Sequence, residues 1–208
     1  MCSSAFSLTV SSPAAEVLLT AGHCGQGHWY NDSSGYGNTW SKEARSFDAM
    51  VLSAKVDNQV WDGGWYGTGG QFQKKVKGAL GTVAGAQLCP SGAPSGIRCG
   101  GRAGEVNVSI DLPGYGRTTR NIQIDGTSGA VLAGNGDSGG PVFSLNGDGV
   151  DARGIISGMA TGSHEKPRAG EPGSASRKCS SRIFAPDITH ALGGLKTANS
   201  NRTFSVRR

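Results

Sequence analysis

The chain has 208 residues, of which 36% are hydrophobic, so it can bury a core as one domain or as two closely packed halves. Its 35 glycines follow no collagen period, and this favours short strands joined by tight turns over long helices. The net charge of +5 comes from scattered basic residues, so no nucleic-acid partner is expected. No apolar run is long enough to predict a membrane span.

The predicted elements are short strands, because apolar runs of four to eight residues recur between turn-forming residues. In chain order they cover residues 5–10, 16–20, 48–55, 75–83, 86–89, 106–110, 121–124, 141–145 and 150–157. The first run alternates as a half-buried strand does and lacks the basic leader of a signal peptide. The sequence NGDG at 146–149 predicts a hairpin turn. Residues 160–178 predict a surface loop, and residues 187–196 a short helix.

Two motifs far apart in the chain carry the functional prediction. In GDSGGP, residues 136–141, Ser138 stands among small residues, and a tight turn there can expose its hydroxyl beside two backbone N–H groups. In TAGHC, residues 20–24, His23 lies next to a cysteine that can hold it in place. A serine hydroxyl needs a base to take its proton before it attacks a carbonyl. We therefore predict Ser138 as a nucleophile and His23 as its base.

Asp48 is the candidate for the carboxylate that orients His23. It opens an apolar strand and lies 25 residues after His23, whereas Asp57 and Asp62 stand in segments typical of exposed turns. A carboxylate in this role fixes the tautomer of the imidazole and stabilises its protonated form.

A zinc site is the alternative use of His23, together with Cys24 and His28. No second cysteine pair stands at metal-binding spacing, so we expect no metal and no other cofactor.

The motifs resemble those of the chymotrypsin-like serine proteases, which also carry His, Asp and Ser in this order. Four further segments resemble the bacterial streptogrisin and α-lytic protease branch: 2–8, 18–25, 88–100 and 182–188. The resemblance implies an all-β fold of two packed antiparallel Greek-key β-barrels with a short C-terminal helix. It divides one peptidase domain into halves at residues 1–83 and 84–183, a helix at 184–197 and a tail at 198–208.

The same resemblance implies a secreted, monomeric serine endopeptidase that hydrolyses polypeptides through an acyl-enzyme. A pro-region or protein inhibitors are further expected partners, and neither a membrane nor a nucleic acid is expected. The alternative is a catalytically silent binding protein with a protease fold, although such proteins usually lose the histidine or serine that this chain keeps. An α/β-hydrolase esterase orders its triad Ser, Asp, His and needs helices that this sequence lacks.

The resemblance also assigns the substrate-binding residues. The backbone N–H groups of Gly136 and Ser138 form the expected oxyanion hole. The edge strand that pairs with extended substrate, and the specificity pocket beside it, comprise Leu132, Asn135, Ile156, Ser157, Gly158 and Met159. Relatives that cut after Arg or Lys carry an aspartate where Leu132 stands, and relatives that cut after Glu carry a histidine where Ile156 stands. We therefore expect cleavage after small or medium apolar residues.

Disulfides are implied between Cys2 and Cys24 and between Cys89 and Cys99, which indicates an oxidising compartment. The resemblance leaves Cys179 unpaired, because Leu132 occupies the position of its usual partner. Cys179 is expected to be a free thiol or to bond to another molecule.

Asp137 is expected to turn inward and to need a cation, since an unpaired buried charge is costly. Bacterial relatives place an arginine directly after the first cysteine of the disulfide hairpin, where this chain has Pro90. Position 98 faces position 90 across the hairpin, so Arg98 is the predicted partner. Arg102 and a water-satisfied carboxylate are the alternatives.

Overall fold

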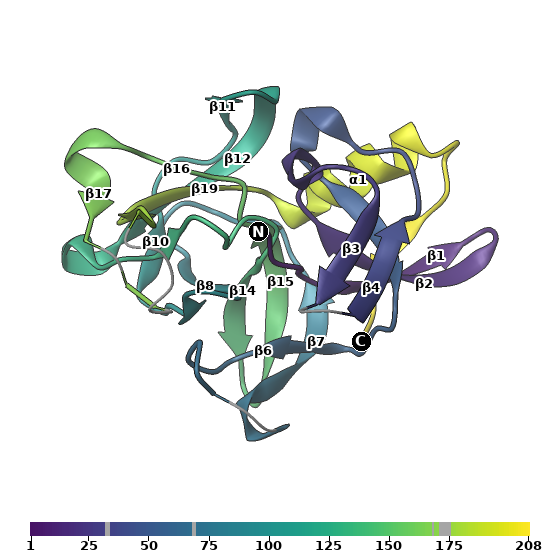
Figure 1. Cartoon of the computed structure of the whole chain (residues 1–208), viewed down its shortest axis with the longest axis horizontal. Helices are drawn as coiled ribbons and strands as arrows, with labels where there is room; N and C mark the ends of the chain where they lie inside the picture. Colours follow the sequence, from purple (N-terminus) through teal and green to yellow (C-terminus); the bar gives the residue numbers. More distant parts are fainter. Residues whose placement is uncertain (32–33, 68–69, 168, 171–175) are drawn as a thin grey trace.

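The computed structural model describes residues 1–31, 34–67, 70–167, 169–170 and 176–208. Strands are the predominant regular structure of the described chain, and the α-helix α1 (Ile188–Ala198) lies near its C-terminal end (Figure 1). The strands form a six-stranded, an eleven-stranded and a three-stranded sheet. The predicted all-β class with a short C-terminal helix is confirmed.

The six-stranded sheet is antiparallel and has the order β20-β1-β2-β5-β4-β3. Its apolar side chains point to one face, as the alternation of Leu8 and Val10 with exposed Thr9 shows. Its strands are β1 (Ser7–Ser11), β2 (Ala14–Thr20), β3 (His28–Asn31), β4 (Ser34–Thr39), β5 (Met50–Ala54) and β20 (Phe204–Val206). The turns η1 (Gly22–Cys24) and η2 (Arg45–Phe47) connect strands of this sheet. His23 lies in η1, and Asp48 directly follows η2.

The eleven-stranded sheet forms the rest of the barrel-like body. Its main path is β16-β19-β12-β10-β8-β14-β15-β7-β6, with β11 paired to β12 and β9 to β8. Its strands are β6 (Gln59–Trp61), β7 (Gln73–Ala79), β8 (Gln87–Gly92), β9 (Gly96–Ile97), β10 (Gly101–Ala103), β11 (Val108–Leu112), β12 (Gly116–Gly126), β14 (Pro141–Asn146), β15 (Gly149–Ile155), β16 (Gly158–Met159) and β19 (Arg182–Pro186).

A small third sheet, β13-β18-β17, lies beside the loop that carries Ser138. It consists of β13 (Ala133–Gly134), β17 (Glu165–Lys166) and β18 (Cys179–Ser180), and the remaining short turns are η3 (Gly70–Phe72), η4 (Thr127–Gly129) and η5 (Gly162–His164). The predicted loop at 160–178 therefore contains η5 and β17, while residues 168 and 171–175 lie outside the described part of the chain.

The eleven-stranded sheet includes strands from both sides of residue 83. Strands β6 and β7 belong to the eleven-stranded sheet, and β7 runs parallel to β15, with Val76 opposite Val150. The physical reason is a shared core: Phe6 and Leu8 of the first half pack in the same buried cluster as Phe143 of the second. The two halves are therefore joined by one core as well as by the chain.

The C-terminal residues were predicted as a tail, and this is wrong for Phe204–Val206. These residues form β20, which pairs with β1 and buries Phe204 and Val206 while Ser205 stays exposed. A three-residue alternation is too short to predict a strand against the polar residues around it. The hairpin at 146–149 is confirmed, with Asn146 opposite Gly149.

The strands β3 and β4 were not predicted, because SGYGNT at 34–39 has no apolar alternation. No described helix has the length and hydrophobicity that crossing a membrane requires.

Candidate active site

His23 and Asp48 form a close, two-point contact. His23 Nδ1 lies 2.7 Å from Asp48 Oδ2, and the backbone N–H of His23 donates to Asp48 Oδ1 at 2.7 Å. Asp48 follows η2 with φ 45° and ψ 47°, a left-handed conformation that aspartate tolerates better than most residues. With Nδ1 directed at the carboxylate, Nε2 is the ring nitrogen left to accept a proton.

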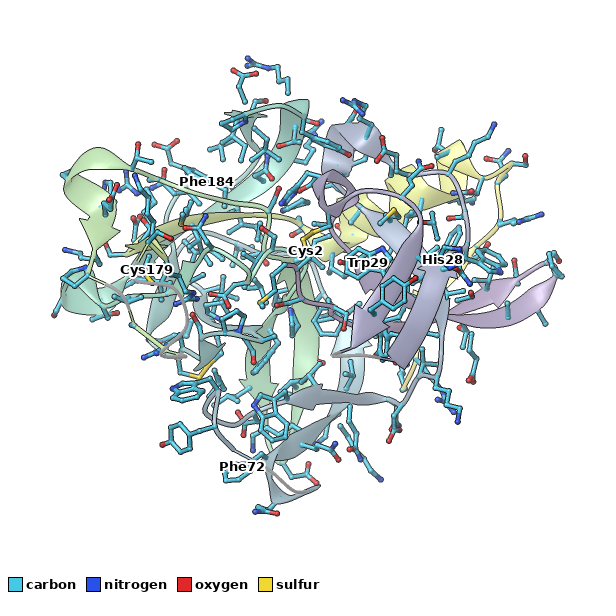
Figure 2. The ribbon with its side chains drawn as sticks, viewed as in Figure 1. Cys2, His28, Trp29, Phe72, Cys179 and Phe184 are labelled. Atoms are coloured by element: carbon cyan, nitrogen blue, oxygen red, sulfur yellow. A yellow bond between two sulfur atoms is a disulfide. The ribbon has the colours of Figure 1, made fainter. Side chains whose placement is uncertain are left out.

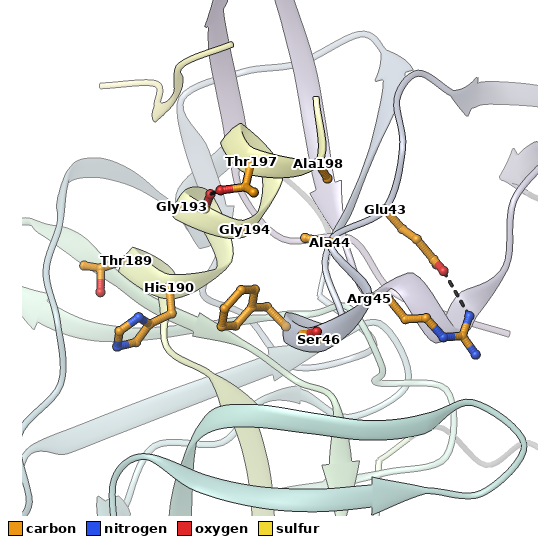
Figure 3. A pocket seen from close by; sticks show the side chains of 11 residues that line it. Glu43, Ala44, Arg45, Ser46, Thr189, His190, Gly193, Gly194, Thr197 and Ala198 are labelled. Carbon is orange, nitrogen blue, oxygen red and sulfur yellow. Dashed lines mark hydrogen bonds and ion pairs between the residues drawn. The ribbon is translucent and has the colours of Figure 1, made fainter. Parts of the chain in front are cut away.

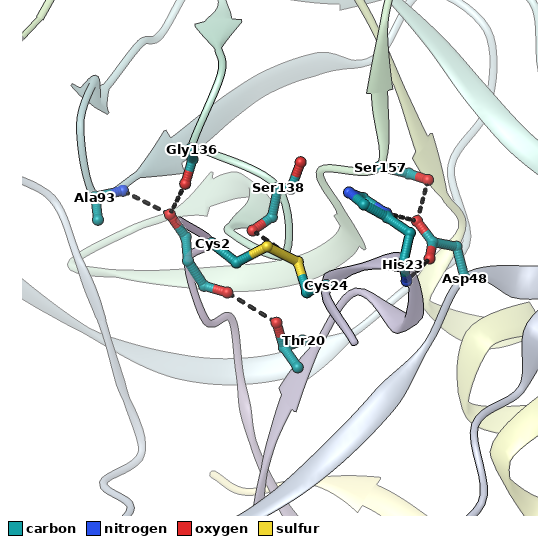
Figure 4. Close-up of a disulfide and its surroundings, with 10 residues drawn as sticks. Cys2, Thr20, His23, Cys24, Asp48, Ala93, Gly136, Ser138 and Ser157 are labelled. Carbon is teal, nitrogen blue, oxygen red and sulfur yellow. Dashed lines mark hydrogen bonds and ion pairs between the residues drawn. A yellow bond between two sulfur atoms is a disulfide. The ribbon is translucent and has the colours of Figure 1, made fainter. Parts of the chain in front are cut away.

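Ser157 completes the surroundings of the Asp48 carboxylate. Both residues are buried, and the Ser157 hydroxyl donates a hydrogen bond to Asp48 Oδ2 (Figure 4). The sequence predicted Ser157 only as part of the substrate-binding strand and gave no signal for this contact. The backbone of Ser157 is held by its N–H bond to the carbonyl of Phe184 in β19.

Ser138 lies on the loop between β13 and β14, next to the imidazole of His23 and the Cys2–Cys24 disulfide (Figure 4). The loop is held by backbone bonds: Ser3 N–H donates to the Ser138 carbonyl at 2.7 Å, and Gly139 N–H to the Ile156 carbonyl at 2.7 Å. The Ser138 side chain is partly exposed, and its hydroxyl makes no hydrogen bond to a described residue.

Two free backbone donors flank Asp137. Within the described chain, neither the N–H of Gly136 nor that of Ser138 has an acceptor. Gly136 has φ 95°, and a Cβ at this position would lie 2.8 Å from Pro94 Cγ, so the turn requires glycine. Free donors of this kind are what an oxyanion hole needs.

The predicted substrate-binding residues gather in the second half, at the edge formed by β16. This strand ends the eleven-stranded sheet and pairs with β19 on one side only. Leu132 and Ile156 are buried in the core of the second half, Met159 packs against that core, and Asn135 is exposed. At Gly158 a Cβ would lie 2.9 Å from Leu112 Cδ2 of β11, so a larger residue there would have to displace the end of that side chain.

The disulfides Cys2–Cys24 and Cys89–Cys99 are confirmed, and Cys179 is a buried free thiol. Figure 2 shows Cys2 between the two halves and Cys179 within the second. Ligand atoms of Cys2, His23 and Cys24 lie within 4.8 Å of one another. Both sulfurs are consumed by the disulfide, so this cluster offers no thiolate to a metal.

The predicted pairing of Arg98 with Asp137 is wrong, and so is the alternative with Arg102, whose side chain is exposed. Asp137 Oδ2 instead lies 2.8 Å from Nη2 of Arg177, and it also accepts from the Ser95 hydroxyl at 2.6 Å. Burial raises the pKa of Asp137, while the hydrogen bonds and the Arg177 charge oppose that shift.

Gly92 and Ser95, rather than residues 90 and 98, are the residues of the Cys89–Cys99 hairpin that contact Asp137. A Cβ on Gly92 would lie 2.2 Å from Asp137 Oδ1, so the carboxylate rests on the hairpin at residue 92. Arg98 N–H donates to the Pro90 carbonyl, and it is Ser95 of the hairpin and Arg177 that bond to the Asp137 carboxylate.

Tyr115, in the turn between β11 and β12, was missed by the sequence reasoning. Its ring lies edge-on to the imidazole of His23 with centroids 6.1 Å apart, and its hydroxyl donates to Glu43 Oε2 at 3.3 Å. Burial, reinforced by the charges of Asp48 and Glu43, raises the pKa of Tyr115 well above its usual value. The guanidinium of Arg45 lies 4.4 Å above the ring. An aromatic residue inside a glycine-rich turn was the only available signal.

A pocket of about 500 Å³ lies between η2 and α1 (Figure 3). None of the predicted site residues lines it. Its lining includes Phe47, which stacks on the ring of His190.

The fold and the site together define a β-barrel protein of the chymotrypsin-like class, with a serine, a histidine and an aspartate at the junction of its halves. The trypsin family model matches residues 9–180, and the chain belongs to this family. A comparison with curated protein sequences found no match.

Solved structures show the same fold. Nocardiopsis protease is 22% identical with a TM-score of 0.69, covering 100% of this chain and 93% of its own. Thermobifida fusca protease A is 24% identical with a TM-score of 0.66, covering 99% and 92%. Cellulomonas bogoriensis chymotrypsin is 20% identical with a TM-score of 0.64, covering 99% and 90%. The trypsin-like fold of bacterial proteases, which the sequence motifs resemble, is confirmed.

Proposed function

We propose that the protein is a serine endopeptidase in which Ser138 is the nucleophile, His23 the general base and Asp48 the carboxylate that orients it. The observation that carries the proposal is the contact of His23 Nδ1 with Asp48, which leaves Nε2 free, together with the position of Ser138 beside the His23 ring (Figure 4). Membership of the trypsin family supports polypeptides as the substrates.

In the first step, Ser138 Oγ bonds to the carbonyl carbon of the substrate while His23 Nε2 takes the hydroxyl proton. The carbonyl π-electron pair moves to its oxygen, and the N–H groups of Gly136 and Ser138 stabilise that oxyanion. Collapse of the intermediate breaks the C–N bond, and His23 returns the proton to the leaving amine. Water then hydrolyses the acyl-enzyme by the same sequence, which restores Ser138.

The substrate backbone is proposed to pair with the open edge of β16 as an added antiparallel strand. Secretion is proposed on the two disulfides, which form in oxidising compartments. We propose a monomer that can bind a pro-region or protein inhibitors at the same edge.

Labelling with a fluorophosphonate probe tests the chemistry. We expect the wild-type chain to be labelled and Ser138→Ala to remain unlabelled, because an activated serine oxygen bonds to the phosphorus of the probe and displaces its fluoride, which leaves a phosphonylated serine. Ser53→Ala, at an exposed serine on β5, is the matched control and should label as the wild type does. Absence of labelling in the folded wild type would favour a silent binding protein instead.

The specificity pocket is proposed to accept small or medium apolar side chains. Leu132 and Ile156 are buried apolar residues and Met159 packs against the same cluster, so none of these three side chains offers a charge to a basic or acidic substrate residue. Each methylene that fits should add about 0.8 kcal/mol to binding. A peptide-library profile checks this, and a profile dominated by cleavage after Arg, Lys or Glu would contradict it.

A further inference from the structure

Arg177 contacts the loop of Ser138 although it lies 40 residues beyond Asp137 in the chain. Its side chain is 6% exposed, and each of its five N–H donors has an acceptor. Its Nε donates to the Asn135 carbonyl at 2.9 Å. Its Nη1 donates to the Ala169 carbonyl and to Cys179 Sγ, the latter at 3.1 Å. Its Nη2 donates to the Ser95 hydroxyl at 2.7 Å and to Asp137 Oδ2 at 2.8 Å.

Two of these bonds hold the residues on either side of Gly136, namely the carbonyl of Asn135 and the carboxylate of Asp137. The Asn135 carbonyl and the Gly136 N–H belong to one planar peptide group, in which C=O and N–H point in opposite directions. A guanidinium that holds the Asn135 oxygen therefore turns the Gly136 N–H to the far side of the peptide plane. The same guanidinium holds the side chain of Asp137, the residue after Gly136.

The peptide needs an anchor from outside the loop. Gly136 has φ 95°, and glycine rotates through this region at little cost, so the local sequence does not fix which way its N–H points. The planar fork of arginine can reach separate acceptors at once, whereas the ammonium group of lysine acts as a point charge.

We propose that Arg177 is a positioning residue that fixes the orientation of the Asn135–Gly136 peptide and so holds the Gly136 N–H ready for the oxyanion. This role rests on the proposed function and adds to it. It goes beyond neutralising the buried charge of Asp137, because the bond to the Asn135 carbonyl would serve no purpose in neutralisation.

The first test compares kcat and KM of Arg177→Met with the wild type, on the fluorogenic peptide that the wild type cleaves best. Removing an oxyanion-hole donor typically lowers kcat about 10²-fold, and we expect a loss of this order with KM changed by less than about threefold. Arg177→Lys keeps a charge near Asp137 and serves as the conservative variant. It should recover most of the melting temperature and little of kcat.

The second test separates positioning from neutralisation. Asp137→Asn removes the buried charge, so Arg177→Met/Asp137→Asn should melt close to Asp137→Asn, while its kcat should stay as low as that of Arg177→Met. A double variant whose kcat lies within about threefold of Asp137→Asn would overturn the proposal. If Arg177→Met does not fold, a wild-type kcat in Arg177→Lys would overturn it equally.

Arg182→Gln is the matched control, since it removes an arginine from another ion pair of the same half, with Asp125. Its kcat should stay within about twofold of the wild type. Fluorophosphonate labelling separates the two levels of failure. An unlabelled wild type defeats the proposed function, whereas a labelled wild type with equal labelling rates in Arg177→Met defeats only the role of Arg177.

Discussion

Asp48 shows how hydrogen bonds satisfy a buried carboxyl group at the centre of this protein. Three donors reach it: the backbone N–H and the Nδ1 of His23, and the hydroxyl of Ser157. An unpaired buried charge costs several kcal/mol, and these bonds compensate for that cost. The left-handed backbone at Asp48 adds local strain, which proteins often tolerate at functional residues.

The buried pair of Arg177 and Asp137 predicts a pH-dependent stability defect. Arg177→Met leaves the carboxylate without a cation and should lower the unfolding free energy by about 3–5 kcal/mol at pH 7. Burial already raises the pKa of Asp137, and the variant raises it further, because the opposing charge is gone. The defect should therefore be full above that raised pKa and shrink as pH falls through it, since protonation removes the buried charge.

Melting temperatures of the wild type and Arg177→Met between pH 8 and pH 4 measure this trend. Arg177→Met/Asp137→Asn is the control, because it lacks the titrating carboxylate and its difference from Asp137→Asn should not vary with pH. A defect of constant size across the range would contradict the explanation.

At the residue scale, the sequence predicted contacts carried by local motifs and missed those made by the fold. His23 and Asp48, each recognised from its own motif, lie in contact as expected. Arg177 comes from a loop rich in turn formers, where nothing distinguishes it from other surface arginines. Its position depends on β18, which brings residues 177–179 beside the Ser138 loop.

At the scale of elements, β20 connects the end of the chain to its beginning. It pairs with β1, and its Phe204 is 4% exposed and packs edge-on against Trp40 with centroids 6.3 Å apart. The preceding helix begins at Asp187, whose carboxylate accepts from Thr189 N–H and thereby caps the first turn. The C-terminal residues therefore contribute to the core.

Phe204→Ala should lower the unfolding free energy by about 3–5 kcal/mol, because it removes a buried ring and leaves a cavity beside Trp40. Ser205→Ala, at the exposed position of the same strand, should change it by less than about 0.5 kcal/mol. Urea denaturation measures both. Equal stability of the two variants would mean that β20 does not contribute to the folded core.

An element with regular apolar alternation, such as β1, was predictable, because one buried face imposes a period of two. The parallel pairing of β7 with β15 was not, since strand partners depend on how the whole chain closes. For the same reason the sheet boundary fell before β6 rather than near residue 83.

At the scale of the whole molecule, the N-terminal residues cross from the first half to the loop of Ser138 (Figure 1). Ser3 N–H donates to the Ser138 carbonyl, and the Ser3 hydroxyl donates to the Gly136 carbonyl at 2.9 Å while accepting from Ala93 N–H. The neighbouring Cys2 is bonded to Cys24, next to His23. One disulfide therefore links the segment that holds the Ser138 loop to the segment that carries His23.

This arrangement predicts different consequences for the two disulfides. They close loops with sequence separations of 22 and 10, so replacing either pair by alanines should lower the unfolding free energy by about 3 kcal/mol, as chain entropy predicts. Fluorophosphonate labelling should slow more in Cys2→Ala/Cys24→Ala than in Cys89→Ala/Cys99→Ala. The first bridge adjoins His23 and Ser3 directly, whereas the second reaches the Ser138 loop through Ser95 and Asp137. The comparison is made at a temperature at which circular dichroism shows both variants folded. Slower labelling of Cys89→Ala/Cys99→Ala than of Cys2→Ala/Cys24→Ala would contradict a special role for the Cys2–Cys24 disulfide.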